Sequence, residues 1–308
     1  DISWMYFNHR ILQEAKKPGV PTIEKLSFLG IYSNNLDEFF RVRIASLNRI
    51  ADNDRVADRT RKTIKRTIKT INKLNEEYSK EYTATVADVF KQLEQHNIRL
   101  IDEKQLNEEQ KKFLEQFYYD ELNGSTNPIW MSAIDDLNTL EDNRIYFAIK
   151  KTHIEDKKVK YAIIKVPDRM FGRFIKVPSS DGFDNIIYLD DVVRFCLPLV
   201  FIGTKPSTYE AFSFKFTKDA EMEVDNEGDY GTMEKIALGV SSRKKGSAVR
   251  VIYDKDMPKD LLKKILDRLN VKELDASLGG GRYQNHKDLM SFPNCGHKEL
   301  KFPKWTQV

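Results

Sequence analysis

The stretch FLGIYSNNLDEFFRVR, residues 28–43, decides how the N-terminal part of this chain folds. An apolar turn runs directly into Ser33, Asn34 and Asn35. Ser and Asn are poor helix-interior residues because their side chains compete for backbone hydrogen bonds. No Gly or Pro follows Gly30 in this stretch, so a loop is not indicated. One explanation is a helix of a packed scaffold whose polar side chains reach out to hydrogen-bond another molecule.

The residues on either side of this stretch predict a helical N-terminal domain. Three helices are expected within residues 1–96, at about residues 3–15, 22–49 and 59–95. Ser3 is the expected N-cap of the first helix, residues 18–21 (Pro-Gly-Val-Pro) end it, and residues 52–55 form the turn before the third. Apolar residues recur at steps of three and four between Ile64 and Tyr78, which predicts one buried stripe. The predicted arrangement is an antiparallel three-helix bundle.

After His96 and Asn97 the pattern changes to a mixture of strands and helices. Strands are expected at residues 98–101, 144–149, 159–166, 173–178, 185–189, 210–217 and 248–253. Helices are expected at residues 107–119, from 190 towards 198, and at 259–269. Asn107 is the expected N-cap of the first of these helices. Two hairpin-like pairs of strands among helices predict a mixed α+β head domain over residues 97–308.

Composition is ordinary for a soluble globular protein, with 40% hydrophobic and 32% charged residues. The formal net charge of +4 is too small to indicate a nucleic-acid partner. Cys196 and Cys295 lie far apart and give neither a metal-binding spacing nor a disulfide framework, which fits a reducing cytoplasm. No apolar run approaches the ~20 residues that span a bilayer, and the chain does not begin with a signal sequence. A cytoplasmic location is therefore expected.

No motif in the chain predicts catalysis or a metal site. The five histidines show no HxH, HExxH or His-Cys grouping, and no GxSxG nucleophile elbow occurs. Gly279, Gly280 and Gly281 precede Arg282, but they lack the spacing of a P-loop and no strand clearly precedes them. Consecutive glycines still permit close backbone approach, so an anion-facing loop remains an alternative. We expect no catalytic residue and no metal ligand here.

Two later segments complete a resemblance to a known family. YDKDMP at residues 253–258 and GGRYQNHKD at residues 280–288 follow SNNLDEFFRVR in the order typical of the long, multi-domain bacterial polyphosphate kinases. The chain resembles the N-terminal and head domains of that family over nearly its whole length. The resemblance implies an enzyme that reversibly transfers the γ-phosphate of ATP to polyphosphate through a phosphohistidine, with Mg²⁺.

The same resemblance assigns the phosphohistidine and the Mg²⁺ ligands to two further domains that this chain lacks, so we expect the chain alone to be inactive. His286 is not that histidine. The implied partners are ATP or ADP, inorganic polyphosphate and a second copy of the protein, since the head domain makes dimer contacts in the family. Phe171, Phe174 and Phe183 are expected to be exposed aromatic side chains that such a dimer covers. The location implied is cytoplasmic or peripheral to the inner membrane.

Asn35 is the candidate contact to the nucleotide. On a helix it lies near Ile31, Tyr32 and Phe39, and an amide with aromatic neighbours suits the edge and face of an adenine ring. In the resembled family the second Asn of the SNN motif contacts ATP, and the matching residue here is Asn35. The alternative is that Asn34 and Asn35 satisfy buried backbone groups where helices meet. The resemblance favours the nucleotide role for Asn35 and leaves Asn34 structural.

Four basic residues are secondary candidates for contacts to phosphate: Arg41, Arg43, Arg282 and Lys287. Asp37 and Glu38 do not form a catalytic carboxylate pair, because adjacent helical residues point about 100° apart. We expect Asp37 to pair with Arg41 one turn later and to orient its guanidinium. A solvated, purely structural ion pair is an equally good interpretation of these residues.

The helix segment 59–73 carries a basic face formed by Lys62, Lys65, Arg66, Lys69 and Lys73. A polyanion such as polyphosphate would be attracted to it, although a solvated helix surface explains the charges equally well. This face also supports an alternative function for the whole chain. That alternative is a non-catalytic interaction module whose basic helix binds an acidic partner.

Overall fold

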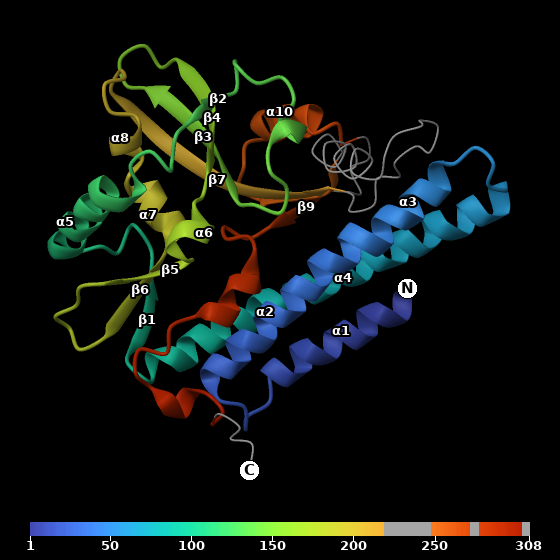
Figure 1. Cartoon of the computed structure of the whole chain (residues 1–308), viewed down its shortest axis with the longest axis horizontal. Helices are drawn as coiled ribbons and strands as arrows, with labels where there is room; N and C mark the ends of the chain where they lie inside the picture. Colours follow the sequence, from blue (N-terminus) through green and yellow to red (C-terminus); the bar gives the residue numbers. More distant parts are fainter. Residues whose placement is uncertain (219–247, 272–276, 304–308) are drawn as a thin grey trace, which may run out of the picture.

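The computed structural model describes residues 1–218, 248–271 and 277–303. A bundle of long helices forms one part of the molecule, and two β-sheets with shorter helices form the other (Figure 1). The predicted combination of a helical N-terminal region and a mixed α+β region is confirmed. Within the described ranges, no helix is both long and apolar enough to cross a membrane.

The bundle consists of three packed helical rods. Its helices are α1 (Ile2–Ala15), α2 (Thr22–Phe39), α3 (Ala45–Asp52) and α4 (Asp58–Glu94). A single π-helical turn, Phe40–Ile44, joins α2 to α3, so these two helices form one rod that packs against α1 and α4. Leu12, Leu26 and Ile71, from the three rods, are completely buried, and each such side chain stabilises the fold by roughly 1.5–3 kcal/mol.

The start of the first helix differs from the prediction. Asp1 occupies the N-cap position of α1, and Ser3 lies inside the helix. Neither residue makes a side-chain cap here, because the structure gives Asp1 no capping hydrogen bond and pairs its carboxylate with Arg43 instead. The prediction that Ser3 is the N-cap is therefore wrong.

The α+β part contains two sheets. The smaller has the strand order β1-β6-β5, with β1 (Ile98–Ile101) parallel to β6 (Asp184–Tyr188) and β5 (Phe174–Val177) antiparallel to it. The larger has the order β2-β4-β3-β7-β8-β9. Its strands are β2 (Ile129–Trp130), β3 (Tyr146–His153), β4 (Val159–Lys165), β7 (Ser207–Lys218), β8 (Ala248–Asp254) and β9 (Ser277–Gly280). Both predicted hairpins, β3 with β4 and β5 with β6, are confirmed.

Short helices cover the sheets. They are α5 (Glu108–Phe117), followed by the π turn Tyr118–Leu122, α6 (Asp168–Phe171), α7 (Leu189–Phe195), α8 (Leu197–Val200) and α10 (Lys259–Arg268). Asn107 caps α5 as predicted, since its side chain accepts from the Gln110 backbone in a capping box. The two faces of β3 pack into two different hydrophobic cores. Phe147 packs towards α5 and α7, and Tyr146 packs towards α10.

The segment after β9 returns to the helical bundle. It forms two 3₁₀ turns, His286–Ser291 and Lys298–Leu300, and the first packs along α2. Gly30 permits this approach, because a Cβ there would lie 2.6 Å from the Met290 Cγ and 3.0 Å from the Lys287 carbonyl oxygen. Residues at the far end of the chain therefore complete the core of the bundle, which the division proposed at residues 96 and 97 did not anticipate.

The three phenylalanines predicted to be exposed are instead half-buried within the chain. Phe171 meets the Phe117 ring edge-on at 6.1 Å, and Phe174 meets Phe292 edge-on at 4.9 Å. The Arg99 guanidinium covers Phe183 at 3.7 Å from the ring centroid. Their exposure was a wrong prediction, because the local sequence does not reveal that side chains distant along the chain pack against these rings.

Candidate functional site

The SNN motif lies in the C-terminal half of α2, where Tyr32 and Leu36 are buried in the bundle. Asn34 is exposed and Asn35 is half-buried. The Asn35 amide donates to Asn8 Oδ1 of α1 at 3.3 Å, and Asn8 in turn donates to the Tyr32 carbonyl at 3.1 Å. This chain of hydrogen bonds fixes the Asn35 side chain against α1. Contact between Asn35 and a nucleotide stays a prediction.

Asp37 does not pair with Arg41, so that prediction is wrong. The guanidinium of Arg41 pairs with Glu38 at 2.8 Å on the bundle surface. Asp37 is buried and points away from the bundle towards the larger sheet, because neighbouring positions on a helix face directions about 100° apart. Its carboxylate contacts Lys215 of β7 at 2.5 Å and Arg250 of β8 at 3.0 Å.

Lys215 and Arg250 reach Asp37 because they share one face of the sheet. Arg250 is the register partner of Thr217, and Lys215 lies two residues before Thr217, so their side chains point the same way. The Lys215 and Arg250 side chains are only 1% and 5% exposed. The Arg250 guanidinium also lies 4.2 Å from the centre of the Phe40 ring. A helix and two strands therefore meet at a single buried carboxylate.

The pKa values of this cluster reflect burial opposed by ion pairing. Burial raises the pKa of Asp37, but Lys215 and Arg250 outweigh that effect and hold it below its ordinary value. Burial lowers the pKa of Lys215, against the opposite effect of Asp37, and it lowers the pKa of Arg250 in the same way. With Asp37 charged, the three side chains carry one negative and two positive charges.

A hydrogen-bond network continues from this cluster to the segment after β9. Lys215 Nζ donates to Asn285 Oδ1 at 2.9 Å, and the Asn285 amide donates to Asp288 at 3.1 Å. Asp288 pairs with Arg173 at 2.9 Å, and Arg173 pairs with the buried Asp190 at 2.6 Å. The network ties the sheet face to the turn that packs on α2.

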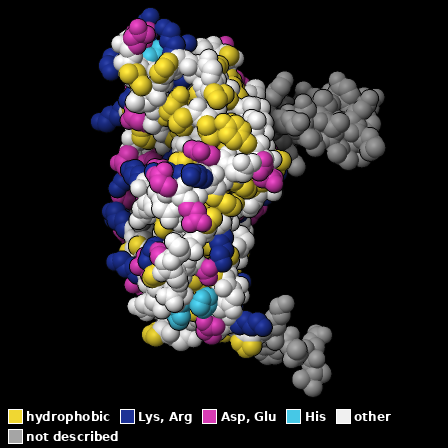
Figure 2. Space-filling view, turned by 90° about the vertical axis from the view of Figure 1, so that its left-hand side faces the viewer, with side chains coloured by type: hydrophobic (Ala, Val, Ile, Leu, Met, Phe, Trp, Pro, Cys, Tyr) yellow, Lys and Arg dark blue, Asp and Glu magenta, His cyan; other side chains and the backbone are white. Residues whose placement is uncertain are grey.

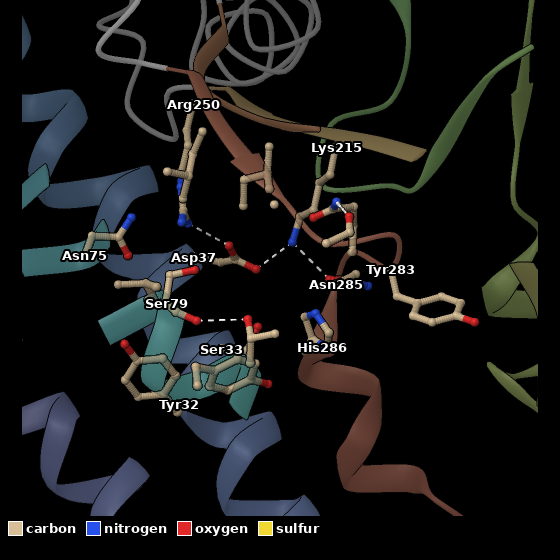
Figure 3. Close-up of a pocket in the computed structure, with 18 residues that line it drawn as sticks. Tyr32, Ser33, Asp37, Asn75, Ser79, Lys215, Arg250, Tyr283, Asn285 and His286 are labelled. Atoms are coloured by element: carbon tan, nitrogen blue, oxygen red, sulfur yellow. Dashed lines mark hydrogen bonds and ion pairs between the residues drawn. The ribbon is translucent and has the colours of Figure 1, made fainter. Parts of the chain in front are cut away.

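A pocket of about 90 Å³ opens beside the cluster, between α2, α4, β8 and residues 280–286 (Figure 3). Its polar lining comprises Ser33, Asp37, Asn75, Ser79, Thr83, Lys215, Arg250, Asn285 and His286, among other residues. Burial, together with the nearby Arg173, lowers the pKa of His286 from 6.5 to about 4, so its imidazole is neutral at physiological pH. Asn35 is not among the described residues that line this pocket.

The other predicted phosphate contacts occupy different environments. Arg43 is 61% exposed and pairs with Asp1 at 2.9 Å. Arg282 is held between Glu103 and Asp191, and these carboxylates raise its pKa against the effect of burial. Lys287 is half-buried and close enough to Asp37 to lower the pKa of that carboxyl. Of the four, Lys287 is the one whose charge affects the pKa values of Asp37 and Lys215, whereas Arg282 is paired with two carboxylates.

Gly279 and Gly280 belong to a strand rather than to a phosphate-binding loop. They end β9, which pairs in parallel with β8, so the expectation that no strand precedes these glycines is wrong. A Cβ on Gly280 would lie 3.1 Å from Ile252 Cγ2 and 3.4 Å from the Gln284 side chain. Close packing at the edge of the pocket therefore explains why position 280 is occupied by a glycine.

Two features of the site were not predicted from the sequence. Lys215 stands in AFSFKFTK, where alternation with Phe212, Phe214 and Phe216 indicates a solvent-facing position. The structure covers that face with α2 and with the segment after β9, so Lys215 is buried. The π turn that carries Arg41 and Arg43 was also missed, although such turns frequently mark functional sites. The sequence of this π turn continues the pattern of the helix around it, so nothing in the sequence distinguishes the turn from an α-helix.

Comparisons with known proteins identify relatives over the whole chain. A family model described as the polyphosphate kinase N-terminal domain matches residues 1–101, and one described as the polyphosphate kinase middle domain matches residues 109–292. The polyphosphate kinase of Vibrio vulnificus strain YJ016 is 34% identical over 98% of this chain and 43% of that protein. The polyphosphate kinase of Escherichia coli K12 is 32% identical over 97% of this chain and 44% of that protein.

A solved structure supports the fold. The crystal structure of polyphosphate kinase from Porphyromonas gingivalis superimposes with a TM-score of 0.80 at 24% sequence identity. It covers 100% of this chain, which in turn spans 43% of that structure. The chain thus spans less than half the length of the relatives that it matches.

Proposed function

Because the chain belongs to the polyphosphate kinase family, we propose that it supplies the N-terminal and head regions of an enzyme that transfers the γ-phosphate of ATP reversibly to polyphosphate. The observation that carries this proposal is the match of two successive domain models, in family order, to residues 1–101 and 109–292. The transfer is proposed to proceed through a phosphohistidine that lies outside this chain.

The ligands of the Mg²⁺ ion are assigned to the same outside region. Among the described residues, no group of three or more His, Cys, Asp and Glu side chains is placed to hold a metal ion. We propose binding and positioning as the contribution of this chain, as the family resemblance implies. Asn35 would contact the adenine, while Arg41, Arg43, Arg282 and Lys287 are proposed contacts to phosphate groups, with Lys287 the best placed beside the buried cluster.

The proposed homodimer has a candidate surface. Phe113, Tyr119, Met170 and Ile202 are exposed by 36%, 53%, 70% and 72%. They belong to or adjoin α5, α6 and α8, which lie on one side of the molecule (Figure 1). Figure 2 views the molecule from that side and shows hydrophobic side chains gathered there. A dimer would remove this apolar surface from water. Sedimentation of the full-length enzyme should show a dimer that Met170→Glu and Ile202→Glu together weaken.

A non-catalytic interaction module that binds an acidic partner is the second candidate. It would explain the exposed basic face of α4, but it does not account for the match across both family domains. The kinase proposal explains both observations, since polyphosphate is itself an acidic partner. We therefore retain the kinase as the proposed function.

The test of the nucleotide role is Asn35→Ala in the full-length enzyme, with Asn34→Ala as the matched control. Loss of one or two hydrogen bonds to ATP, each worth about 0.5–1.5 kcal/mol, should raise the KM for ATP roughly three- to tenfold. The melting temperature should change little, and Asn34→Ala, at an exposed position, should leave both quantities unchanged. A melting temperature lowered by several degrees with an unchanged KM would place Asn35 in the scaffold, through its bond to Asn8.

A further inference from the structure

The pocket beside Asp37 carries an excess of buried positive charge. Lys215 and Arg250 are 1% and 5% exposed, and Asp37 is the single carboxylate that both contact. Asn285, the other described hydrogen-bond partner of Lys215, is neutral. Lys287 adds a further positive charge nearby. A buried charge without a partner is costly, so an anion that entered this pocket would be stabilised.

Hydrogen-bond donors at the pocket wall are also unused. Within the described residues, Arg250 makes one hydrogen bond, from Nη1 to Asp37, which leaves Nε and Nη2 available. Asn75 of α4 is 4% exposed, and its amide has no hydrogen bond to any described residue. Figure 3 shows this amide pointing into the pocket on the side of Arg250. Neither the amide nor the open guanidinium donors are sealed away from solvent, so an anion that enters the pocket can accept hydrogen bonds from both.

The size and chemistry of the pocket restrict that ligand. A volume of about 90 Å³ admits a few water molecules or one small anion, but not a nucleotide. Water would satisfy the amide without balancing the excess charge. A tetrahedral oxyanion satisfies the amide and also balances the charge, since its oxygens accept hydrogen bonds from the guanidinium, the ammonium and the amide at once. Ser33 and Ser79 add hydroxyl donors along the α2 and α4 walls, whereas the Thr83 hydroxyl donates to the Ser79 carbonyl.

We propose that this pocket binds a single phosphate group, with Arg250 and Lys215 as its charged partners and Asn75 as a neutral donor. The site deepens the proposed function and rests on it for the choice of phosphate over other oxyanions. The phosphate is either free orthophosphate or the terminal group of a polyphosphate chain, and the same donors recognise both. Asp37, which is itself part of the pocket lining, holds the two cations in place.

The experiment titrates the 308-residue chain with orthophosphate and, separately, with tripolyphosphate, at an ionic strength held constant with chloride. Calorimetry measures the affinity, and thermal unfolding measures the stabilisation that a bound ligand confers. We expect saturable binding at one site for at least one of the two ligands. Binding of orthophosphate identifies a site for free phosphate, whereas binding of tripolyphosphate alone identifies a site for a chain end.

Variants separate this site from general attraction to a basic surface. Asn75→Leu should weaken binding roughly three- to tenfold, as expected for one lost hydrogen bond, without lowering the melting temperature of the ligand-free chain. Arg250→Gln should weaken it by about tenfold or more, and Arg250→Lys should restore part of the affinity. Asn185 is also 4% exposed but lies in the smaller sheet and donates to Ser179, so Asn185→Leu should lower the melting temperature and leave the affinity unchanged.

The absence of saturable binding by either ligand would overturn the site. Binding that is equally strong in Asn75→Leu and Arg250→Gln would also overturn it, because the anion would then lie elsewhere. Neither result bears on the family membership of the chain or on the ATP kinetics of Asn35→Ala. Failure of this proposal can therefore be distinguished from failure of the proposed function.

Discussion

At the scale of single residues, Asp37 links the helical bundle to the sheet. Replacing it with Asn would leave Lys215 and Arg250 buried without a negative partner. Breaking a buried pair in this way costs about 3–5 kcal/mol, so Asp37→Asn should lower the free energy of unfolding by that amount in urea denaturation. The adjacent Glu38→Gln removes only an exposed pair with Arg41 and should cost less than about 1 kcal/mol. Equal effects of the two substitutions would contradict the assigned role of Asp37.

His286 makes stability depend on pH in a defined window. Its pKa is lowered by burial and by Arg173 from 6.5 to about 4, so between these values the unfolded chain binds a proton that the folded protein does not. The free energy of unfolding should therefore fall as the pH falls through this window. His286→Gln should reduce the loss between pH 7.5 and pH 5 by about 2 kcal/mol.

The control for this prediction is His297→Gln, at a partly exposed histidine that pairs with Glu299. With His286 still in place, this variant should show most of the loss between pH 7.5 and pH 5. Urea denaturation at the two pH values measures all three proteins. The same pH dependence in His286→Gln as in the unmodified chain would show that His286 is not the group responsible.

How far residue roles could be predicted depended on the distance to their partners along the chain. Asn107 and its capping box with Gln110 lie three residues apart, and the capping role of Asn107 was predicted correctly. Asp37 is separated from Lys215 by 178 residues and from Arg250 by 213, so helical spacing suggested Arg41 instead. The predicted phosphate contacts of Arg41 and Arg43 rested on the donor geometry of the guanidinium group, and those of Arg282 and Lys287 on the neighbouring glycines. The pair of Arg41 with Glu38 is local, whereas the partners of Arg43 and Arg282 lie far away along the chain and could not be read from local patterns.

At the scale of secondary-structure elements, periodicity identified the long helices because each buries one stripe of apolar residues. The helix predicted at residues 22–49 corresponds to α2, the π turn and α3, which end at Asp52. The π turn was missed because it widens the helix without interrupting it. Strand β7 was located, but its Lys215 face was not recognised as buried, since alternation cannot show that a helix covers the polar side.

The basic face of α4 consists of Lys62, Lys65, Arg66, Lys69 and Lys73, which are all exposed and form no ion pair with any described residue. Replacing the first four with Gln should weaken the binding of long polyphosphate by the full-length enzyme. By analogy with nucleic-acid phosphates, each lost contact should reduce the slope of log affinity against log salt by roughly 0.7–0.9. Binding measured over a range of salt concentrations tests this directly.

A matched variant controls for the change in net charge. Lys157, Lys158, Lys160 and Lys205 are also exposed but lie around β3, β4 and the start of β7, away from α4 (Figure 1), and two of them, Lys158 and Lys205, pair with Asp156. Their replacement with Gln should leave the slope close to that of the unmodified enzyme. If both quadruple variants flatten the slope equally, polyphosphate responds to total charge and the α4 face is only solvated.

At the scale of the whole molecule, the fold class could be predicted, since a helical region followed by mixed strands and helices is visible in the sequence. The way in which the helical part and the α+β part pack together could not be predicted from the sequence. Residues 286–300 return to α2, and Leu289, Phe292 and Leu300 complete the bundle core from the far end of the chain. The same return places His286 and Asn285 beside Asp37, so the pocket exists only in the assembled molecule.

The most direct measurement of the central claim is ATP-dependent polyphosphate synthesis by two purified proteins, in the presence of Mg²⁺. One is the 308-residue chain, and the other is the protein extended through the region that the longer relatives possess. The account predicts synthesis by the extended protein and none by the 308-residue chain, because the proposed phosphohistidine lies outside it. Synthesis by the 308-residue chain alone, or its absence from a folded extended protein, would contradict the account.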